Sequence, residues 1–332
     1  MRFSSSTASV LWGVCIAICA TKLAAQTSVS NHAGKPGGAT LFPVLLITPD
    51  ARSGGMAGAG VAVSPDANTP SINPAKLAFA ESDYGLAVSY CPWMPNAVSD
   101  VGLAYVSSFF RAGQNGAVAS SLRFFSAGEI RLTDIGQQDL GTFAPGEYAF
   151  DLAYARKFGD QFSLATSLRY MSSAFTDVRA MAVDVSTFYK RPAHIMGMEA
   201  IVAGGIHIAN IGMHVNTTGG LGEEQTLPSA VRIGGASTIL FGEYNEFTLA
   251  ADYNTEGWTA VGMEYWCRNR FALRTGYHYG LWDNGQRYFT VGGGLKHQWL
   301  QVDFSYLIAN TQQNLVANTI RLGLLLNFGH PQ

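Results

Sequence analysis

Charged residues are scarce in this sequence, and no long apolar run follows its first 25 residues. Only 13% of the 332 residues are charged, about half the share of an ordinary soluble domain, while 48% are hydrophobic. A disordered chain combines low hydrophobicity with high net charge, so that class is excluded. The 21 basic and 23 acidic residues leave a net charge of −2, and without a basic surplus we expect no nucleic-acid partner. No later segment reaches the run of about 18 apolar residues that a membrane-spanning helix needs.

Residues 1–25 have the features of a secretory signal peptide. A cationic start at Arg2 precedes an apolar run from Ala8 to Ala20, and small residues lead up to Ala25. This pattern predicts export, with cleavage after Ala25. The small and polar residues 26–40 that follow are expected to form a flexible lead.

Apolar residues alternate with small or polar ones along most of the remaining chain. Phe162, Leu164 and Leu168, for example, share one face of a stretch whose other face carries Ser163 and Ser167. Alternation with a period of two marks a strand with one apolar face. The runs are about ten residues long, which is the length a tilted strand needs to cross a bilayer. The predicted strands are 84–91, 99–111, 115–135, 146–158, 160–172, 179–190, 196–210, 230–241, 246–255, 258–268, 270–280, 287–297, 298–309 and 319–329.

Fourteen strands of this length are typical of an outer-membrane β-barrel, which has an even strand number. Connections after even-numbered strands are short and those after odd-numbered strands are mostly long, as expected for periplasmic turns and outer loops. We therefore predict an all-β fold, a 14-stranded antiparallel transmembrane β-barrel over residues 83–329, surrounded by outer-membrane lipid. A charge network is expected to line its lumen, formed by Glu246, Asp252, Arg274, Arg321, Arg169 and Asp151.

A segment with several glycines and prolines, residues 41–82, precedes the strands. A barrel of this size encloses more volume than its own side chains fill, so we predict that the segment is a plug, or hatch, in the lumen. A cap outside the barrel is the alternative. Its polar residues either form a gate or ligand contact, or hydrogen-bond the plug to the wall, since buried polar groups need partners. These candidate residues are Asp50, Arg52, Asp66, Asn68 and Asn73, with Pro74 at the start of a short predicted helix.

Several motifs fall between residues 43 and 175 of the chain. They are Pro49–Met56, Ser64–Asn68, Asn73–Lys76, Tyr84–Trp93, Ser121–Ile130 and Ala153–Lys157. In these motifs the chain resembles the PorV/PorQ family, and its PorV branch most closely. That family comprises outer-membrane proteins of the type IX secretion system of the Bacteroidetes. Beyond residue 175 only the barrel pattern continues the resemblance.

The resemblance implies a fold similar to the FadL fatty-acid transporters, a 14-stranded barrel with an N-terminal hatch. It also implies binding of secreted cargo with a C-terminal signal domain, and transfer of that cargo from the type IX translocon barrel to the surface sortase complex. Outer loops 92–98, 136–145 and 211–229 are the expected contact regions. Trp93 and Met94, between two prolines, form a stiff apolar tip that suits protein docking. Packing of these two side chains on neighbouring loops is the alternative.

Motifs for catalysis or cofactor binding are missing from the sequence. It has no phosphate-binding or dinucleotide-binding glycine motif and no Gly-x-Ser-x-Gly, so we predict no enzyme, no cofactor and no metal site. Cys91 and Cys267 either pair in an oxidising compartment or remain apart as small apolar residues. Two other functions stay open beside cargo transfer. One is a FadL-like outer-membrane channel for hydrophobic small molecules, and the other is an outer-membrane lipid hydrolase.

Overall fold

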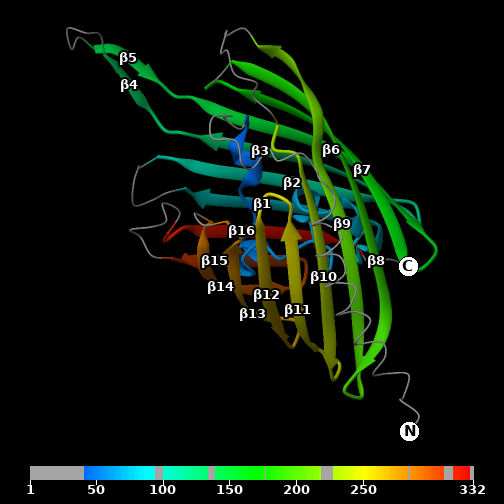
Figure 1. Cartoon of the computed structure of the whole chain (residues 1–332). Helices are drawn as coiled ribbons and strands as arrows, with labels where there is room; N and C mark the ends of the chain where they lie inside the picture. Colours follow the sequence, from blue (N-terminus) through cyan, green and yellow to red (C-terminus); the bar gives the residue numbers. More distant parts are fainter. Residues whose placement is uncertain are drawn as a thin grey trace.

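The computed structural model of the chain describes residues 41–93, 100–133, 139–175, 177–217, 227–282, 285–309 and 317–329. Fourteen antiparallel strands close into a barrel, because the first strand pairs with both the second and the last (Figure 1). The predicted all-β class and 14-stranded barrel are therefore confirmed. Within the described residues, no helix is long and apolar enough to cross a membrane. The predicted signal peptide and flexible lead lie outside the described residues.

The barrel strands follow one another around the wall, with one interruption between β3 and β6. They are β1 (Tyr84–Pro92), β2 (Gly102–Ala112), β3 (Gly116–Ser126), β6 (Gly146–Phe158), β7 (Phe162–Ser173), β8 (Val178–Ile195), β9 (Met198–Thr217), β10 (Ala230–Phe241), β11 (Asn245–Asn254), β12 (Trp258–Cys267), β13 (Phe271–Gly280), β14 (Arg287–His297), β15 (Leu300–Ile308) and β16 (Ile320–Phe328). A separate two-stranded sheet contains β4 (Ile130–Thr133) and β5 (Asp139–Phe143).

Strand β6 shows why these sequences form membrane strands. Phe150 and Leu152 point outward and are 45% and 50% exposed, whereas Ala149, Asp151 and Ala153 between and beside them are buried. Large apolar side chains thus face the surroundings of the barrel, and small or polar ones face its interior. This arrangement is stable in lipid, since a closed barrel also pairs every strand edge.

The predicted third strand, 115–135, is wrong in its second half. Strand β3 ends at Ser126, and Gly128 adopts φ 75°, a left-handed conformation that glycine tolerates. After this break β4 pairs only with β5, and the two form a hairpin that projects beyond the barrel at the upper left of Figure 1. Alternation continues across the break, so the residue pattern alone could not reveal the change of sheet.

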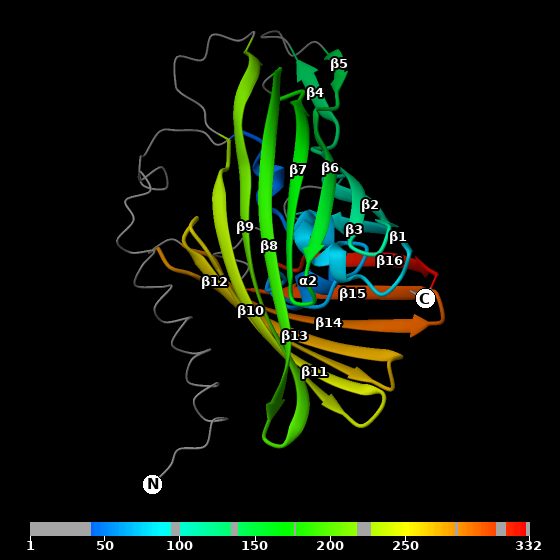
Figure 2. The same ribbon diagram turned by 90° about the vertical axis from the view of Figure 1, so that its right-hand side faces the viewer.

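Strands β8 and β9 are longer than the predicted 179–190 and 196–210. Their hairpin includes the pairs from Arg191 to Ile195, beyond Tyr189, where pairing with β7 ends. Proline has no backbone N–H to donate, and Pro192 is tolerated there because β8 no longer pairs with β7 at this position. The hairpin extends past the adjacent turns at the bottom of Figure 2.

The two ends of the barrel differ in their connections. Tight turns follow β2, β6, β8, β10, β12 and β14, and we call this the short-turn end. The opposite, long-loop end includes the β4–β5 hairpin and two short connections, at 174–177 and 255–257.

Residues 41–80, called the N-terminal segment below, lie among inward-facing strand residues (Figure 2). The segment contains η1 (Pro43–Leu46), α2 (Ala51–Gly55), η2 (Thr69–Ser71) and η3 (Pro74–Phe79).

Candidate functional site

Arg52 in α2 joins the N-terminal segment to the barrel wall. Its Nε and Nη2 donate to the two carboxylate oxygens of Glu264 in β12, at 2.9 and 2.6 Å. Its Nη1 donates to Asp66 Oδ2 and to the Ser64 carbonyl, both at 3.0 Å. Arg52 and Glu264 are buried. A bidentate pair shielded from water in this way is stronger than an exposed one.

The same charges continue along the wall. Glu264 Oε2 also accepts from Arg274 Nε in β13 at 2.6 Å, and Arg274 Nη1 donates to Asp303 in β15 at 2.7 Å. We call Arg52, Asp66, Glu264, Arg274 and Asp303 the latch cluster. Positive and negative groups alternate through it, so removing either arginine leaves a carboxylate without its ion-pair partner.

Wall side chains also bind main-chain groups of the segment. Six of them are arginines or hydroxyl residues that donate to its carbonyl oxygens: Thr290 to Gly55, Ser107 to Ala67, Ser163 to Ala75, Arg321 to Thr48, Arg111 to Ala80, and Arg123 to Val44 and Leu45. In the opposite sense, Asp252 Oδ2 accepts from the N–H groups of Gly60 and Val61 at 2.9 and 3.0 Å. The strands thus supply partners for backbone groups of the segment that are not paired within a regular helix or sheet.

Two buried asparagines of the segment differ in their partners. Asn73 Nδ2 donates to the carbonyls of Val61 and of Thr187 in β8, both at 3.0 Å. Its Oδ1 caps η3, which begins at Pro74. The Asn68 side chain, in contrast, has no hydrogen-bond partner among the described residues. Asn73 therefore joins segment and wall, and Asn68 does not.

Asp50 and Lys76 are buried titratable groups of the segment. Asp50 caps α2, with Oδ1 accepting from the Ser53 N–H at 2.7 Å. Burial, together with the nearby Asp66, raises the pKa of Asp50 to about 6. Lys76 Nζ donates to the Gly60 carbonyl at 2.7 Å, and burial lowers the pKa of Lys76 to about 8.

Glycines of the wall let the segment approach closely. Gly276 in β13 and Gly262 in β12 face each other in register, and the backbone of Met56 lies against both. A Cβ atom at Gly276 would be 2.4 Å from the Met56 carbonyl carbon. The segment can occupy this position only because both strand residues lack a side chain.

A second cluster of charges lies on the other side of the lumen. Arg169 in β7 forms ion pairs with Asp151 in β6 at 2.5 Å and with Asp184 in β8 at 3.0 Å. It also donates to Asn210 in β9. We call these four residues the wall cluster, because all of them belong to barrel strands.

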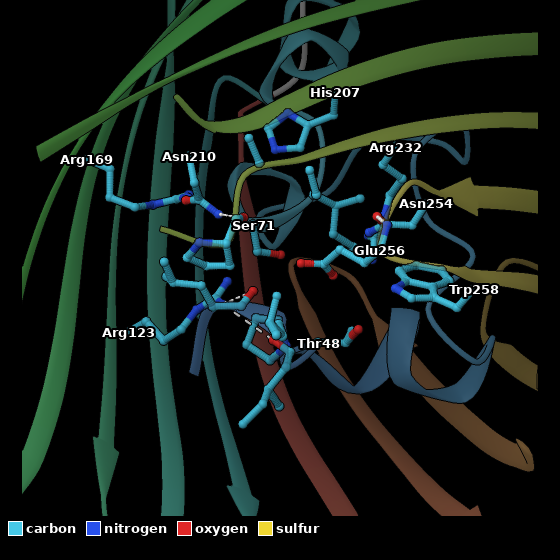
Figure 3. A pocket seen from close by; sticks show the side chains of 18 residues that line it. Thr48, Ser71, Arg123, Arg169, His207, Asn210, Arg232, Asn254, Glu256 and Trp258 are labelled. Atoms are coloured by element: carbon cyan, nitrogen blue, oxygen red, sulfur yellow. Dashed lines mark hydrogen bonds between the residues drawn. The ribbon is translucent and has the colours of Figure 1, made fainter. Parts of the chain in front are cut away.

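A cavity of about 60 Å³ separates this part of the wall from residues 45–49 (Figure 3). The guanidinium of Arg232 lies over the Trp258 ring, 4.5 Å from its centroid. Glu256 also lines the cavity, and burial raises the pKa of its carboxyl group. The other charged or aromatic lining residues are Arg123, Arg169 and His207. Such a small polar cavity suits water or a small polar group better than a hydrocarbon.

The predicted docking residue Trp93 is half-buried. Its side chain packs against Val44, Cys91 and Leu103, and its backbone N–H donates to the Val101 carbonyl at 2.9 Å. Met94 lies outside the described residues. Cys91 and Cys267 are both free thiols.

The structure brings together part of the predicted polar residues. Arg52 and Asp66 form one ion pair, and Arg169 and Asp151 form another. The sequence reading missed three carboxylates that complete the clusters. The alternation pattern could have revealed them, because each occupies an inward position of its strand. These residues are Glu264, Asp303 and Asp184.

Comparison with known proteins gives the family. A family model described as type IX secretion system protein PorV matches residues 32–256, more than half of the chain. The chain belongs to the PorV family. It is therefore an outer-membrane barrel of the type IX secretion family, as the resemblance in its motifs predicted. No curated protein matches it.

Solved structures similar to this PorV-family chain share its fold. The toluene transporter TodX of P. putida is 12% identical, with a TM-score of 0.52 over 85% of this chain and 99% of TodX. The CymD monoaromatic hydrocarbon channel is 12% identical, with a TM-score of 0.50 over 86% and 99%. A Pseudomonas aeruginosa FadL homologue is 12% identical, with a TM-score of 0.49 over 85% and 99%. At such low identity the likeness to TodX and CymD shows the fold alone.

Proposed function

We propose that this protein binds secreted cargo with a C-terminal signal domain and passes it from the type IX translocon barrel to the surface sortase complex, without catalytic turnover. Membership of the PorV family supports a role in type IX secretion. The observation that carries the proposal is the occupied lumen, where the latch cluster ties the N-terminal segment to the wall. A segment tied to the inner wall in this way favours binding at the outer face of the barrel over passage through it.

The long-loop end offers the surface for such binding. The β4–β5 hairpin projects there beyond the barrel (Figure 1), and β1 and β9 end there, at the predicted contact regions 92–98 and 211–229. The third predicted region, 136–145, includes β5. Half-buried Trp93 anchors the base of the first loop. In our proposal these loops, with Trp93 and Met94, contact the translocon, the cargo and the sortase complex, since interfaces are enriched in aromatic residues and methionine.

A channel for hydrophobic molecules is the weaker candidate. TodX and CymD, whose titles describe a toluene transporter and a hydrocarbon channel, share the fold. A channel requires an apolar pocket, whereas the cavity beside the segment is small and lined by Arg123, Arg169, Arg232 and Glu256. The polar lining therefore favours protein transfer.

The test is recovery of partners from outer membranes. We expect the tagged protein to co-purify with a large translocon barrel and with secreted cargo. Replacing residues 130–143 with a short Gly-Ser turn should abolish this recovery. Replacing residues 191–199 at the opposite end is the matched control and should preserve it. Recovery of the tagged protein alone, with bound fatty acid, contradicts the proposal. Unchanged attachment of cargo to the cell surface after deletion of the gene also contradicts it.

A further inference from the structure

Three neighbouring turns at the short-turn end enclose a groove of about 760 Å³. They connect β10 to β11, β12 to β13 and β14 to β15, and they lie side by side at the lower right of Figure 2. We call this surface the turn groove. Its lining residues are Tyr244, Arg268, Asn269, Arg270, Lys296, His297 and Gln298.

Backbone hydrogen bonds hold the three turns against one another. The Asn269 N–H donates to the Tyr244 carbonyl at 2.8 Å, and the Lys296 N–H donates to the Arg270 carbonyl at 2.7 Å. The Arg268 N–H donates to an asparagine side chain, Oδ1 of Asn245, at 3.0 Å. The groove is thus built before any ligand arrives, and its basic residues are presented from a fixed backbone.

The turn groove is strongly basic. Arg268, Arg270 and Lys296 line it, and none of them forms a salt bridge within the described part of the chain. Among the described residues, Lys296 Nζ donates only to the neutral Asn269 side chain, at 3.2 Å. Two carboxylates, Glu243 and Glu246, lie close in sequence to the groove residue Tyr244. Because the groove is lined by three basic residues, its net charge remains positive.

The apolar belt of the barrel ends next to this charge. Phe271 and Leu295 face each other in register, point outward and are 57% and 51% exposed. Each directly adjoins a basic residue of the groove, Arg270 or Lys296. Exposed aromatic rings of Tyr244 and Trp299 lie at the same end. In a membrane barrel, this change from apolar side chains to aromatic and basic ones marks the level of the lipid headgroups.

We propose that the turn groove binds the phosphate of an anionic phospholipid in the periplasmic leaflet. Short turns of outer-membrane barrels face the periplasm, so the groove lies at the headgroups of that leaflet. The acyl chains of the bound lipid lie along Phe271 and Leu295, and its phosphate contacts Arg268, Arg270 and Lys296. Continuity of the groove with the apolar belt favours a lipid over an acidic protein, which would need no apolar neighbour.

The experiment measures lipid retention by the purified full-length protein. The protein is incubated with phosphatidylglycerol, phosphatidylcholine or lipid A, and bound lipid is counted by native mass spectrometry. We expect phosphatidylglycerol to be retained in preference to the other two. The variant with Arg268→Gln, Arg270→Gln and Lys296→Gln should bind phosphatidylglycerol about a hundredfold more weakly, because each of the three basic residues near an anionic surface contributes about fivefold.

A matched control removes three positive charges elsewhere on the same end, by Arg156→Gln, Lys157→Gln and Arg191→Gln. It should retain the lipid, and heat-dependent gel mobility verifies that both variants are folded. The charge-conserving variant Arg268→Lys with Arg270→Lys should also retain it. Equal loss in both triple variants, equal retention of phosphatidylcholine, or preference for lipid A overturns the proposal. Retention of an acidic protein through the groove, with no bound lipid, also overturns it.

Discussion

Two sides of the lumen use the same chemistry for different purposes. On the side of β12, β13 and β15, the latch cluster includes Arg52 and Asp66 of the N-terminal segment. On the side of β6 to β9, the wall cluster is satisfied within the strands, and a cavity separates that wall from residues 45–49. A buried arginine between carboxylates fastens the segment in the first case and braces neighbouring strands in the second.

Of the changes proposed here, Arg52→Ala should weaken the attachment of the N-terminal segment to the wall most strongly. Removing one partner of a buried ion pair costs about 3–5 kcal/mol, and here the loss falls on the contact between segment and wall. Proteolysis within residues 41–80 and ion conductance in planar bilayers should both increase. Arg169→Ala is the matched control, expected to lower the heat stability of the barrel without exposing the segment. Equal proteolysis of the segment in both variants would contradict the claim that the latch cluster, and not the wall cluster, holds the segment in place.

Gly276→Ala tests whether close backbone approach fixes the segment on the latch side. The added Cβ would lie 2.4 Å from the Met56 backbone, so the segment must shift, at a cost of about 1–3 kcal/mol. At Gly235 the nearest atom to an added Cβ is 3.9 Å away, and Gly235→Ala should leave the segment in place. Protease accessibility of residues 41–80 measures both. No difference between the two alanines would refute the role of Gly276.

Asn73→Ala and Asn68→Ala compare two buried asparagines of one segment. Asn73→Ala leaves the carbonyls of Val61 and Thr187 without their donor, at a cost of about 1–2 kcal/mol. Asn68→Ala removes an amide without a described partner, and its effect should stay below about 0.5 kcal/mol. Thermal unfolding followed by gel mobility ranks them. A larger loss at Asn68 would contradict the assignment of contacts.

Lowering the pH should strengthen docking of the segment to the wall. The docked Asp50 has a pKa of about 6 against 3.8 in its ordinary state, so the docked form binds the proton more tightly. Between pH 7.5 and 5 this linkage favours docking by about tenfold, and the gain disappears again as the pH rises through 6. Asp50→Asn should remove that part of the pH dependence. Easier proteolysis of the wild-type segment at pH 5 would show the opposite sign.

Alternation predicted the barrel well because one face of each strand must be apolar in lipid. It failed after Ser126, where pairing with β6 ends and a local glycine conformation redirects the chain. Within the site, Arg52 and Asp66 could be singled out as a dense polar group. Glu264, the second partner of Arg52, is 212 residues away in the sequence, and which strands face the segment depends on barrel closure and not on local sequence.

That separation between Arg52 and Glu264 also fixes an order of assembly. The N-terminal segment precedes every barrel strand, yet the ion-pair partner of Arg52 and the strands that α2 contacts, β13 to β16, come from the last third of the chain. Loops this long close late, because local pairings form before distant ones. We therefore expect α2 to reach its final contacts only after the C-terminal strands have joined the wall, whereas η3 can pack earlier on β3, β6, β7 and β8.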